Sequence, residues 1–206
     1  SGITASNKTY DGNTTASLGI SLISYNGLIA GDVFNGTYSG VFDNKNVGTS
    51  KTVTITPSYT GADVSNYSVT DQASTTANIT AKGLTVSGIT ASNKVYDANT
   101  SATLDVSSVS YSGLVSGDVF NGTYSGVFDN KNVGTGKTVT ITPSYTGADV
   151  SNYSVTNQAT TTANVTVKAL TVSVSAANKT YNGNTTATTT LTLSGLIGTE
   201  TLGQSV

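Results

Sequence analysis

One internal offset dominates this sequence, because residues 1–86 align with residues 87–172 without a gap. Of the 86 aligned positions, 69 are identical and 17 differ. A third copy begins at Ser173 and continues to residue 206. We call these three segments copy one, copy two and copy three. A period of 86 residues is longer than the roughly 20–50 residues of a solenoid coil, so each full copy is expected to fold as a small domain.

The boundaries between copies carry no linker sequence. "ANITAKGLTVSGIT" (77–90) and "ANVTVKALTVSVS" (163–175) run strand-forming residues across each boundary, without Pro, a Gly-Ser tract or a block of charge. We therefore expect the last strand of one copy to lead directly into the first strand of the next, which should limit bending. The predicted domains are 1–83 for the first repeat, 84–168 for the second and 169–206 for a partial third.

The composition favours strands. Thr is the commonest residue, only 10% of residues are charged, and His, Cys, Met, Trp and Arg are all absent. β-Branched residues lose rotamer freedom in helices and pack well on a pleated surface. Short runs such as "KTVTITPSY" (51–59) are separated by turn signals, and we expect turns at Asn26-Gly27 and at Asn35-Gly36. The chain is therefore predicted to be all-β.

The strand pattern also predicts core positions. In "KTVTIT" (51–56), Val53 and Ile55 alternate with threonines, so one face of this strand should be buried. About six or seven strands per copy is typical of an immunoglobulin-like sandwich, and we predict tandem sandwiches of this kind in an elongated rod. A β-grasp-like or other compact β repeat is the alternative. Conservative exchanges between copies predict further core positions at Ile20/Val106, Ile23/Val109 and Ile79/Val165.

The residue types of common catalytic sites are scarce. There is no His or Cys, the acids are ten Asp and Glu200, and no Ser or Thr stands beside an evident activating partner. We expect neither enzyme activity nor a cofactor. The net charge of −2 and the lack of a Lys-rich run argue against nucleic acid as a partner. No apolar stretch approaches the ~20 residues needed to cross a bilayer, so membrane insertion is not expected.

Bound calcium is an alternative that stays open. Asp and Asn cluster in "FDNKNVG" (42–48 and 128–134) and in "GADVSN" (61–66 and 147–152), and calcium prefers such oxygen ligands. The first cluster lacks the register of a calcium-binding loop, because Lys45 stands where an oxygen ligand would be needed. A solvated turn is the simpler interpretation. The weak calcium candidates are Asp43, Asn46, Asp63, Asp129, Asn132 and Asp149.

One phrase recurs near the start of every copy: "NKTYDGNT" (7–14), "NKVYDANT" (93–100) and "NKTYNGNT" (178–185). Gly12 becomes Ala98, and Asp11 becomes Asn182, so neither an obligatory glycine with positive φ nor a metal-binding carboxylate is expected. We interpret the phrase as a strand end with an anchoring Tyr and a polar turn. The shared residues are Asn7, Lys8, Tyr10 and Asn13; Asn93, Lys94, Tyr96 and Asn99; and Asn178, Lys179, Tyr181 and Asn184.

Three motifs in order, "NKTYDGNT", "GADVSNYSVT" and "ANITAKGLTV", resemble the YDG and MBG repeats of large bacterial surface adhesins of the filamentous-haemagglutinin type. The resemblance covers both full copies and the partial third. It implies an extracellular or surface-attached protein whose β repeats form a stalk and project a binding region for adhesion or biofilm formation. The implied partners are neighbouring repeats of the same long chain, and host or matrix glycans or proteins. In the alternative, each repeat is itself a glycan- or protein-binding module.

The segment from Gly31 to Thr70 differs between the two full copies only at Ser50. Its aromatic and acidic residues would be the place to look for a ligand-reading surface, although we favour a core role for the aromatic rings. The residues concerned are Phe34, Tyr38, Phe42, Asp43, Tyr59 and Tyr67.

Overall fold

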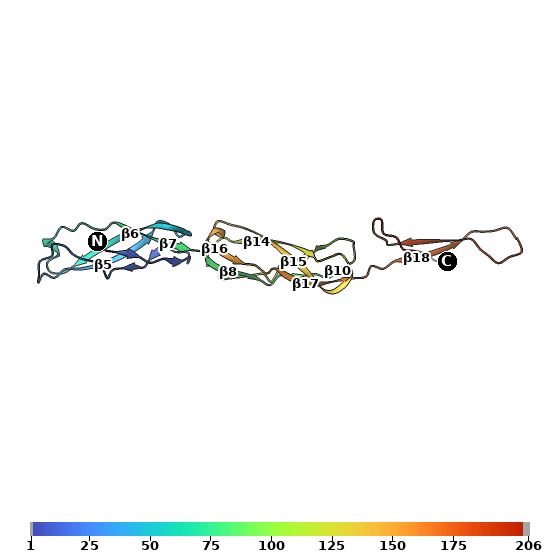
Figure 1. Ribbon diagram of the computed structural model, residues 1–206, viewed down its shortest axis with the longest axis horizontal. Coiled ribbons are helices and arrows are strands. Elements are labelled where there is room, and N and C mark those ends of the chain that lie inside the picture. Colours follow the sequence, from blue (N-terminus) through green and yellow to red (C-terminus); the bar gives the residue numbers. More distant parts are fainter. Residues whose placement is uncertain (1, 204–206) are drawn as a thin grey trace. The chain divides into compact units, whose positions relative to one another are not determined.

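The computed structural model describes residues 2–203 and consists of strands and short 3-10 turns, with no α-helix among the described residues (Figure 1). The all-β prediction is confirmed. None of the described helical turns is long or apolar enough to cross a membrane. The chain divides into two compact units. The first contains the residues up to Ser87, Val109–Thr123 and Ser144–Asn157, and the second contains Gly88–Ser108, Tyr124–Pro143 and the residues from Gln158 onward.

Copy one lies in the first unit and supplies eight short elements. They are β1 (Thr4–Ala5), β2 (Lys8–Thr9), β3 (Thr15–Ala16), β4 (Leu18–Gly19), β5 (Asn35–Phe42), β6 (Gly48–Thr60), the 3-10 turn η1 (Val64–Asn66) and β7 (Ser74–Thr80). Five strands form a sheet of order β2-β7-β6-β5-β3, and the sheets are barrel-like. Strand β2 runs parallel to β7, whereas the other neighbours are antiparallel. Strands β1 and β4 form a separate antiparallel pair.

The first unit also contains a three-stranded sheet that joins the two copies. Its order is β13 (Ser110–Ser112), β8 (Lys82–Ser87) and β16 (Tyr153–Thr156), and the 3-10 turn η2 (Val150–Asn152) precedes β16. Only Ala81 separates β7 from β8. The chain therefore passes from the sheet of copy one directly into a sheet made with copy two, and the expected strand-to-strand junction is present at this boundary. At the second boundary the expectation was wrong, because residues 167–170 form no strand and separate the strand that ends at residue 166 from the one that begins at residue 171.

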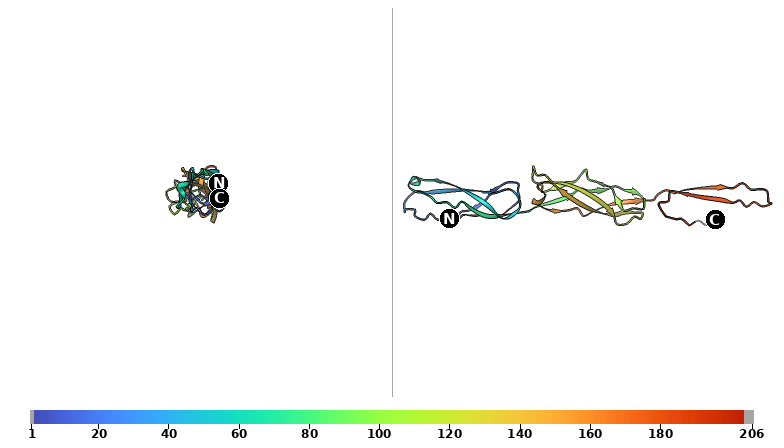
Figure 2. Two further views of the ribbon diagram at one scale, coloured as in Figure 1. Left: turned by 90° about the vertical axis from the view of Figure 1, so that its left-hand side faces the viewer. Right: turned by 90° about the horizontal axis from the view of Figure 1, so that it is seen from above.

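The second unit repeats the sheet of copy one. Its five-stranded sheet has the order β10 (Lys94–Val95), β17 (Thr160–Thr166), β15 (Gly134–Thr146), β14 (Asn121–Phe128) and β11 (Ser101–Ala102), and β9 (Thr90–Ala91) pairs with β12 (Leu104–Asp105). Both β14 and β15 have residues in each unit. In copy three, β18 (Thr171–Ala176) and β19 (Thr189–Ser194) form an antiparallel hairpin, drawn in orange and red in Figure 2.

The predicted alternation in β6 is confirmed, because Val53 and Ile55 are 0% and 5% exposed while the neighbouring threonines face solvent. The predicted core pair Ile79 and Val165 is also buried. The pair Ile20 and Val106 was wrongly predicted, since these side chains are 49% and 47% exposed. Each follows directly after a two-residue strand, where the chain turns away from the sheet and the strand's buried face ends.

The predicted turn at Asn35-Gly36 was also wrong. These two residues open β5 and pair with Thr60 and Tyr59 of β6. The glycine serves close packing here, because a Cβ at Gly36 would collide with the hydroxyl groups of two tyrosines, Tyr25 and Tyr38. By contrast, the predicted turn at Asn26-Gly27 is present, and Gly27 has a φ of +91°.

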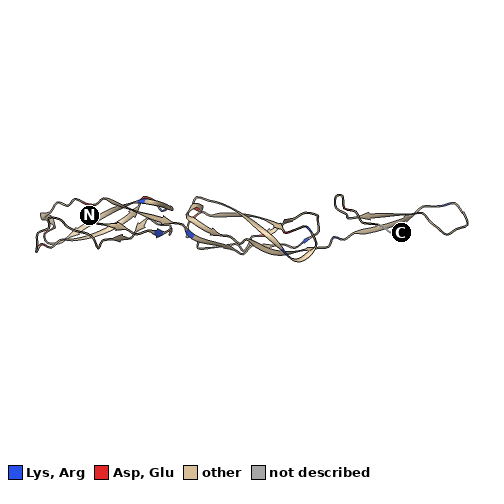
Figure 3. Cartoon of the chain, viewed as in Figure 1, with Lys and Arg blue, Asp and Glu red and all other residues tan. Residues whose placement is uncertain are grey.

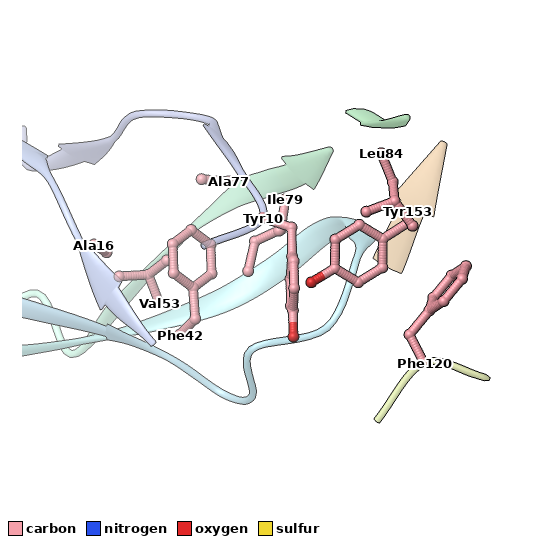
Figure 4. Close-up of a cluster of buried hydrophobic side chains, with 9 residues drawn as sticks. All are labelled: Tyr10, Ala16, Phe42, Val53, Ala77, Ile79, Leu84, Phe120 and Tyr153. Atoms are coloured by element: carbon pink, nitrogen blue, oxygen red, sulfur yellow. The ribbon is translucent and has the colours of Figure 1, made fainter. Parts of the chain in front are cut away.

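Two hydrophobic cores result. The first lies in the first unit and draws side chains from both copies: Tyr10, Ala16, Phe42, Val53, Ala77, Ile79, Leu84, Phe120 and Tyr153 (Figure 4). The second lies in the second unit and contains Phe128, Val139, Ala163 and Val165. Charged residues are few, and Figure 3 shows them at isolated positions along the ribbon.

Candidate functional site

The recurring phrase forms a turn that is closed by its lysine. In copy one, Lys8 Nζ donates hydrogen bonds to the carbonyl and the Oδ1 of Asn13, both at 2.9 Å, and to the Thr15 carbonyl at 3.1 Å. It also forms an ion pair of 2.7 Å with Asp11. Asn7 Oδ1 accepts the amide proton of Asn78 at 2.7 Å, which ties the turn to β7. Four positions of the phrase thus have structural partners.

The contacts of both the asparagine and the lysine recur in copy two, and those of the lysine recur in copy three. Lys94 Nζ donates to the carbonyl and Oδ1 of Asn99, and Asn93 Oδ1 accepts the Asn164 amide. In copy three, Lys179 Nζ donates to Asn184 Oδ1 at 2.7 Å and to Asn182 Oδ1 at 3.0 Å. An amide therefore replaces the aspartate without loss of the lysine's hydrogen bond, which explains why an Asp-to-Asn exchange is tolerated at this position.

The glycine of the phrase does need a positive φ, contrary to the sequence argument. Gly12 has a φ of +81°, and Ala98 adopts a φ of +63° at the same turn. The alanine occupies the small left-handed region that non-glycine residues reach at some cost, so the exchange changed the residue and kept the backbone. In copy one the glycine has a second role, because a Cβ there would lie 2.8 Å from Cγ1 of Val115 in copy two.

Tyr10, the anchor of the phrase, reaches into copy two within the first unit. Its side chain is buried, and its hydroxyl donates to Asp118 Oδ2 at 2.8 Å. The ring meets that of Tyr153 edge-on, with centroids 5.6 Å apart and an interplanar angle of 75°. Figure 4 shows these two rings next to each other, with Leu84 and Phe120 completing the cluster. The tyrosine therefore fastens copy one to copy two.

Lys45 completes this contact. Its Nζ lies 2.8 Å from Asp118 Oδ1 and 2.8 Å from Asp149 Oδ1. The side chains of the two acids are only 3% and 10% exposed. The Tyr153 hydroxyl donates to Asp118 as well, at 2.6 Å. One cation and two phenols from three separate segments thus satisfy two nearly buried carboxylates, and buried charges are expected to be paired in this way.

These contacts shift the pKa values of the groups involved. For Asp118, burial alone would raise the pKa, but the hydrogen bonds from Lys45 and from two tyrosine hydroxyls lower it below its usual value. The pKa of Asp149 is lowered mainly by Lys45. The two carboxylates in turn raise the pKa of Lys45. Burial and the bond to Asp118 raise the pKa of Tyr153 to about 12. The contact therefore favours the ionised forms of Asp118, Asp149 and Lys45 and the neutral form of Tyr153.

Asn152 adds a third contact between the copies. Its side chain is 1% exposed, and its Oδ1 accepts the backbone amide of Val47 at 3.0 Å. Its Nδ2 donates to Asn46 Oδ1 at 3.3 Å. Among the described residues, no buried side-chain nitrogen or oxygen lacks a hydrogen-bond partner. We call Tyr10, Lys45 and Val47 the donor end of a copy, and Asp118, Asp149, Asn152 and Tyr153 the acceptor end.

Part of this pattern recurs in the second unit. Tyr96 and Lys131 are the copy-two equivalents of Tyr10 and Lys45, and the Tyr96 hydroxyl donates to Glu200 of copy three. Lys131 Nζ lies 3.8 Å from the same carboxylate. Glu200 aligns with the acceptor aspartate, because "GLIAGD" (27–32) and "GLVSGD" (113–118) correspond to "GLIGTE" (195–200). Among the described residues, a tyrosine and a lysine of one copy thus contact an acid of the next copy at two places.

The calcium candidates lie in separate contacts, except for Asp149 and Asn46, which share one. Asp43 pairs with Lys51, and Asp129 pairs with Lys137, each at 2.8 Å. Asp63 accepts the Val33 amide. The remaining aspartate and asparagine, Asp149 and Asn46, belong to the contact around Lys45, and Asn132 takes part in a turn with its amide bonded to Asn130. Lysine ammonium groups therefore already balance three of these carboxylates. Among residues 2–203, no group of three or more His, Cys, Asp or Glu side chains is arranged to hold a metal ion.

Of the aromatic residues in the constant stretch, only Phe42 is fully buried. The others line a cavity of about 380 Å³ within copy one. Tyr38 and Tyr25 share a hydrogen bond of 2.9 Å between their hydroxyls, which raises the pKa of Tyr25 to about 12. Tyr59 donates to Asp71 at the same cavity. The predicted core role thus holds for Phe42, whereas the remaining rings border an open space.

The anchoring role predicted for the tyrosine of the phrase is confirmed for Tyr10, whose partners the sequence did not reveal. It was wrong for Tyr181, which is 93% exposed, because the phrase of copy three lies in no strand. Among the residues of this contact, Asp149 was a calcium candidate, Lys45 was noted only for breaking the calcium register, and Asp118 and Asn152 were assigned no role of their own. A signal did exist: these positions and their equivalents fall in the segment that is constant between copies. The ion pair joins residues 73 positions apart, however, and such a separation has no local pattern that could identify the partner.

The comparisons with known proteins agree with the repeat organisation. No curated protein and no solved structure matches the chain. A family profile does match, and it is described as the YDG domain. It covers residues 1–77 and 80–163, which correspond to the two full copies. The chain therefore belongs to the YDG domain family.

Proposed function

We propose that this chain forms non-enzymatic stalk or spacer repeats of an exported bacterial adhesin, which hold a binding region away from the cell surface for adhesion or biofilm formation. The observation that carries the proposal is the contact between copies. The buried Tyr10 and the partly exposed Lys45 of copy one bind acids of copy two, and β8 enters a sheet of copy two. Buried polar contacts between repeats should limit their movement relative to each other, which is the property that a spacer needs. Membership of the YDG family adds support.

In this proposal each copy is an immunoglobulin-like sandwich, and the repeats are domains 1–83, 84–168 and 169–206. The protein lies outside the bacterial cell. Its partners are neighbouring repeats of the same chain, with host or matrix glycans or proteins bound elsewhere in a longer protein. Nucleic acid, membrane insertion and a cofactor play no part.

Adherence and scattering test the spacer role together. The chain would be coupled to beads at one end, and the beads incubated with host cells and with matrix components. Spacer repeats should leave adherence at the level of uncoated beads, while X-ray scattering of the free chain should give the profile of a rod. Strong adherence by the chain alone would contradict a pure spacer, and a compact scattering profile would contradict a stiff stalk.

The alternative is that each repeat is itself a binding module. One observation favours it: the cavity of copy one is lined by Tyr25, Tyr38, Tyr59 and Tyr67 with Asp71, and aromatic rings with a few polar or charged groups are typical of ligand pockets. Adherence that is lost on changing Tyr59 to Ala, with the fold intact, would support this second function.

A further inference from the structure

Strand β8, at the end of copy one, occupies the centre of a sheet whose two outer strands belong to copy two. Its residues Thr85–Ser87 pair antiparallel with β13, with Val86 opposite Tyr111. Its residues Lys82–Thr85 pair parallel with β16, with Leu84 opposite Val155. One extended segment at the end of copy one thus satisfies backbone groups on two strands of copy two.

The fit of β8 is close. Leu84 is 0% exposed and Val86 is 2% exposed, while Thr85 between them faces solvent. Gly113, just after β13, lies against this strand, because a Cβ there would come within 2.5 Å of the Gly83 carbonyl. The apolar face of β8 therefore fills the interior, and its backbone leaves no room for a larger residue at Gly113.

The same two flanks exist in copy one, where they border a cavity. The equivalents of β13 and β16 are residues 24–26 and 67–70, and neither segment forms a strand. Both line the 380 Å³ cavity, together with Phe34, Tyr38 and Tyr59. Gly27, the equivalent of Gly113, has nothing within 4 Å of the place where its Cβ would be. Val69, the equivalent of half-buried Val155, is 39% exposed.

The floor of this groove already has the arrangement seen in copy two. The Tyr67 hydroxyl donates to Asp32 at 2.5 Å and accepts the Ile29 amide at 3.0 Å. The equivalent Tyr153 hydroxyl donates to Asp118 at 2.6 Å and accepts the Val115 amide at 2.9 Å. Binding a strand would therefore require little rearrangement of these groups, and preorganisation of this kind favours affinity.

We propose that the groove between residues 24–26 and 67–70 of copy one binds the junction strand of another repeat of this type. The occupant is an extended segment with the pattern Lys-(Gly/Ala)-Leu-Thr-Val-Ser, as at 82–87 and 168–173. Its leucine lies opposite Val69, its valine lies opposite Tyr25, and both point into the cavity. Main-chain hydrogen bonds supply affinity and the two apolar side chains supply specificity, as in other cases of strand addition. The proposal does not depend on export or on adhesion.

A peptide tests the proposal on the full chain. The peptide has the sequence of residues 80–88, "TAKGLTVSG", and is titrated into the 206-residue protein while backbone amide signals are followed by NMR. We expect saturable shifts at Tyr25 and Val69, and slower amide exchange over residues 67–70. The shifts should leave Tyr111 and Val155 unchanged, because β8 already fills copy two.

Two peptides of equal charge provide the matched control. The peptide with Leu84→Asp should bind about tenfold or more weakly, because it places a carboxylate in the apolar groove. The peptide with Thr85→Asp should bind within about twofold of the parent, because that side chain faces solvent in β8. Absence of binding at millimolar peptide, equal binding of the two variants, or shifts at Val155 in place of Val69 would each overturn the proposal. Since no cell or matrix ligand enters this experiment, its outcome is independent of the adherence test.

Discussion

Lys45 is the residue on which the contact between copies depends most. It is the cation placed 2.8 Å from both Asp118 and Asp149, whose side chains are almost fully buried. Removing it would leave two carboxylates close together in a poorly hydrated site. An unpaired buried charge is costly even where the intact pair contributes little net stability.

Replacing Lys45 with Met should therefore lower the free energy of unfolding by about 3 kcal/mol. The measurement is denaturant unfolding of the full chain followed by circular dichroism. Lys131→Met is the matched control, because Lys131 occupies the same position in copy two and its ion pair is longer, at 3.8 Å, and exposed. That control should cost less than about 1 kcal/mol. Equal losses in the two variants would contradict the assigned role of Lys45.

The lowered pKa of Asp118 makes the contact sensitive to acid. The folded pKa lies below the ordinary value of 3.8, so the carboxylate contributes its full stabilisation above that pH and loses it as the pH falls through the folded pKa. The raised pKa of Lys45 makes the contact sensitive to alkali as well. The stabilisation from Lys45 is complete below pH 10.5, its ordinary pKa, and is lost as the pH rises through its pKa in the folded protein.

We therefore expect the stability difference between the native chain and Asp118→Asn to be large at neutral pH and to shrink below about pH 4. Denaturant midpoints measured at several pH values give this difference. Asp105→Asn is the control, because Asp105 is exposed and its lowered pKa comes only from the neighbouring Ser107. A difference for Asp118→Asn that does not change with pH would show that its carboxylate is not the stabilising group.

At the scale of elements, the sequence predicted the long strands well. The alternation of Val53 and Ile55 located β6, because a face buried on one side imposes a period of two. Asn35-Gly36 misled the prediction, because the local pair resembles a hairpin turn while the tyrosine hydroxyls beside Gly36 require a small residue in a strand. The identity of β8 as a strand was clear from its sequence. Its membership of a sheet in copy two was not, because pairing partners depend on the tertiary fold.

Strand β8 provides a test between two equivalent leucines. Leu84 is fully buried between β13 and β16, whereas Leu170, at the same position of the next copy, is 40% exposed. Leu84→Ala should reduce the free energy of unfolding by about 2–5 kcal/mol, because it opens a cavity in the core. Leu170→Ala should change it by about 0.5 kcal/mol or less. Thermal or denaturant unfolding of both variants decides the matter, and similar losses would show that β8 is not packed as described.

At the scale of the whole molecule, the repeat and its family could be established from sequence, and the contact between copies could not. The 86-residue period gave the two copies directly. The donor end and the acceptor end come from segments far apart in the chain, and each looks like an ordinary polar turn when viewed alone. The boundary between the two compact units falls within copy two, so two segments of copy two belong to the same unit as copy one. Tertiary contacts determine such a boundary, and the amino-acid composition does not change where it falls.

Because copy one and part of copy two form one unit, their unfolding should be coupled. Val53→Ala opens a cavity in copy one, and we expect faster exchange of the Val119 amide of copy two, which donates to Asp149. Adding Lys45→Met to this variant should weaken the coupling. Hydrogen exchange measured by NMR gives both effects. Exchange at Val119 that is unaffected by Val53→Ala would mean that the copies open independently.

The position of β8 also decides how the junction responds to tension. A force that pulls copy one away from copy two is applied at Lys82, the start of β8, and acts along the length of that strand. The hydrogen bonds to β13 and β16 lie across this direction on both sides. They are therefore loaded together in shear and cannot break one after another as in a peeled hairpin. This arrangement should resist the separation of copy one from copy two when tension acts along β8.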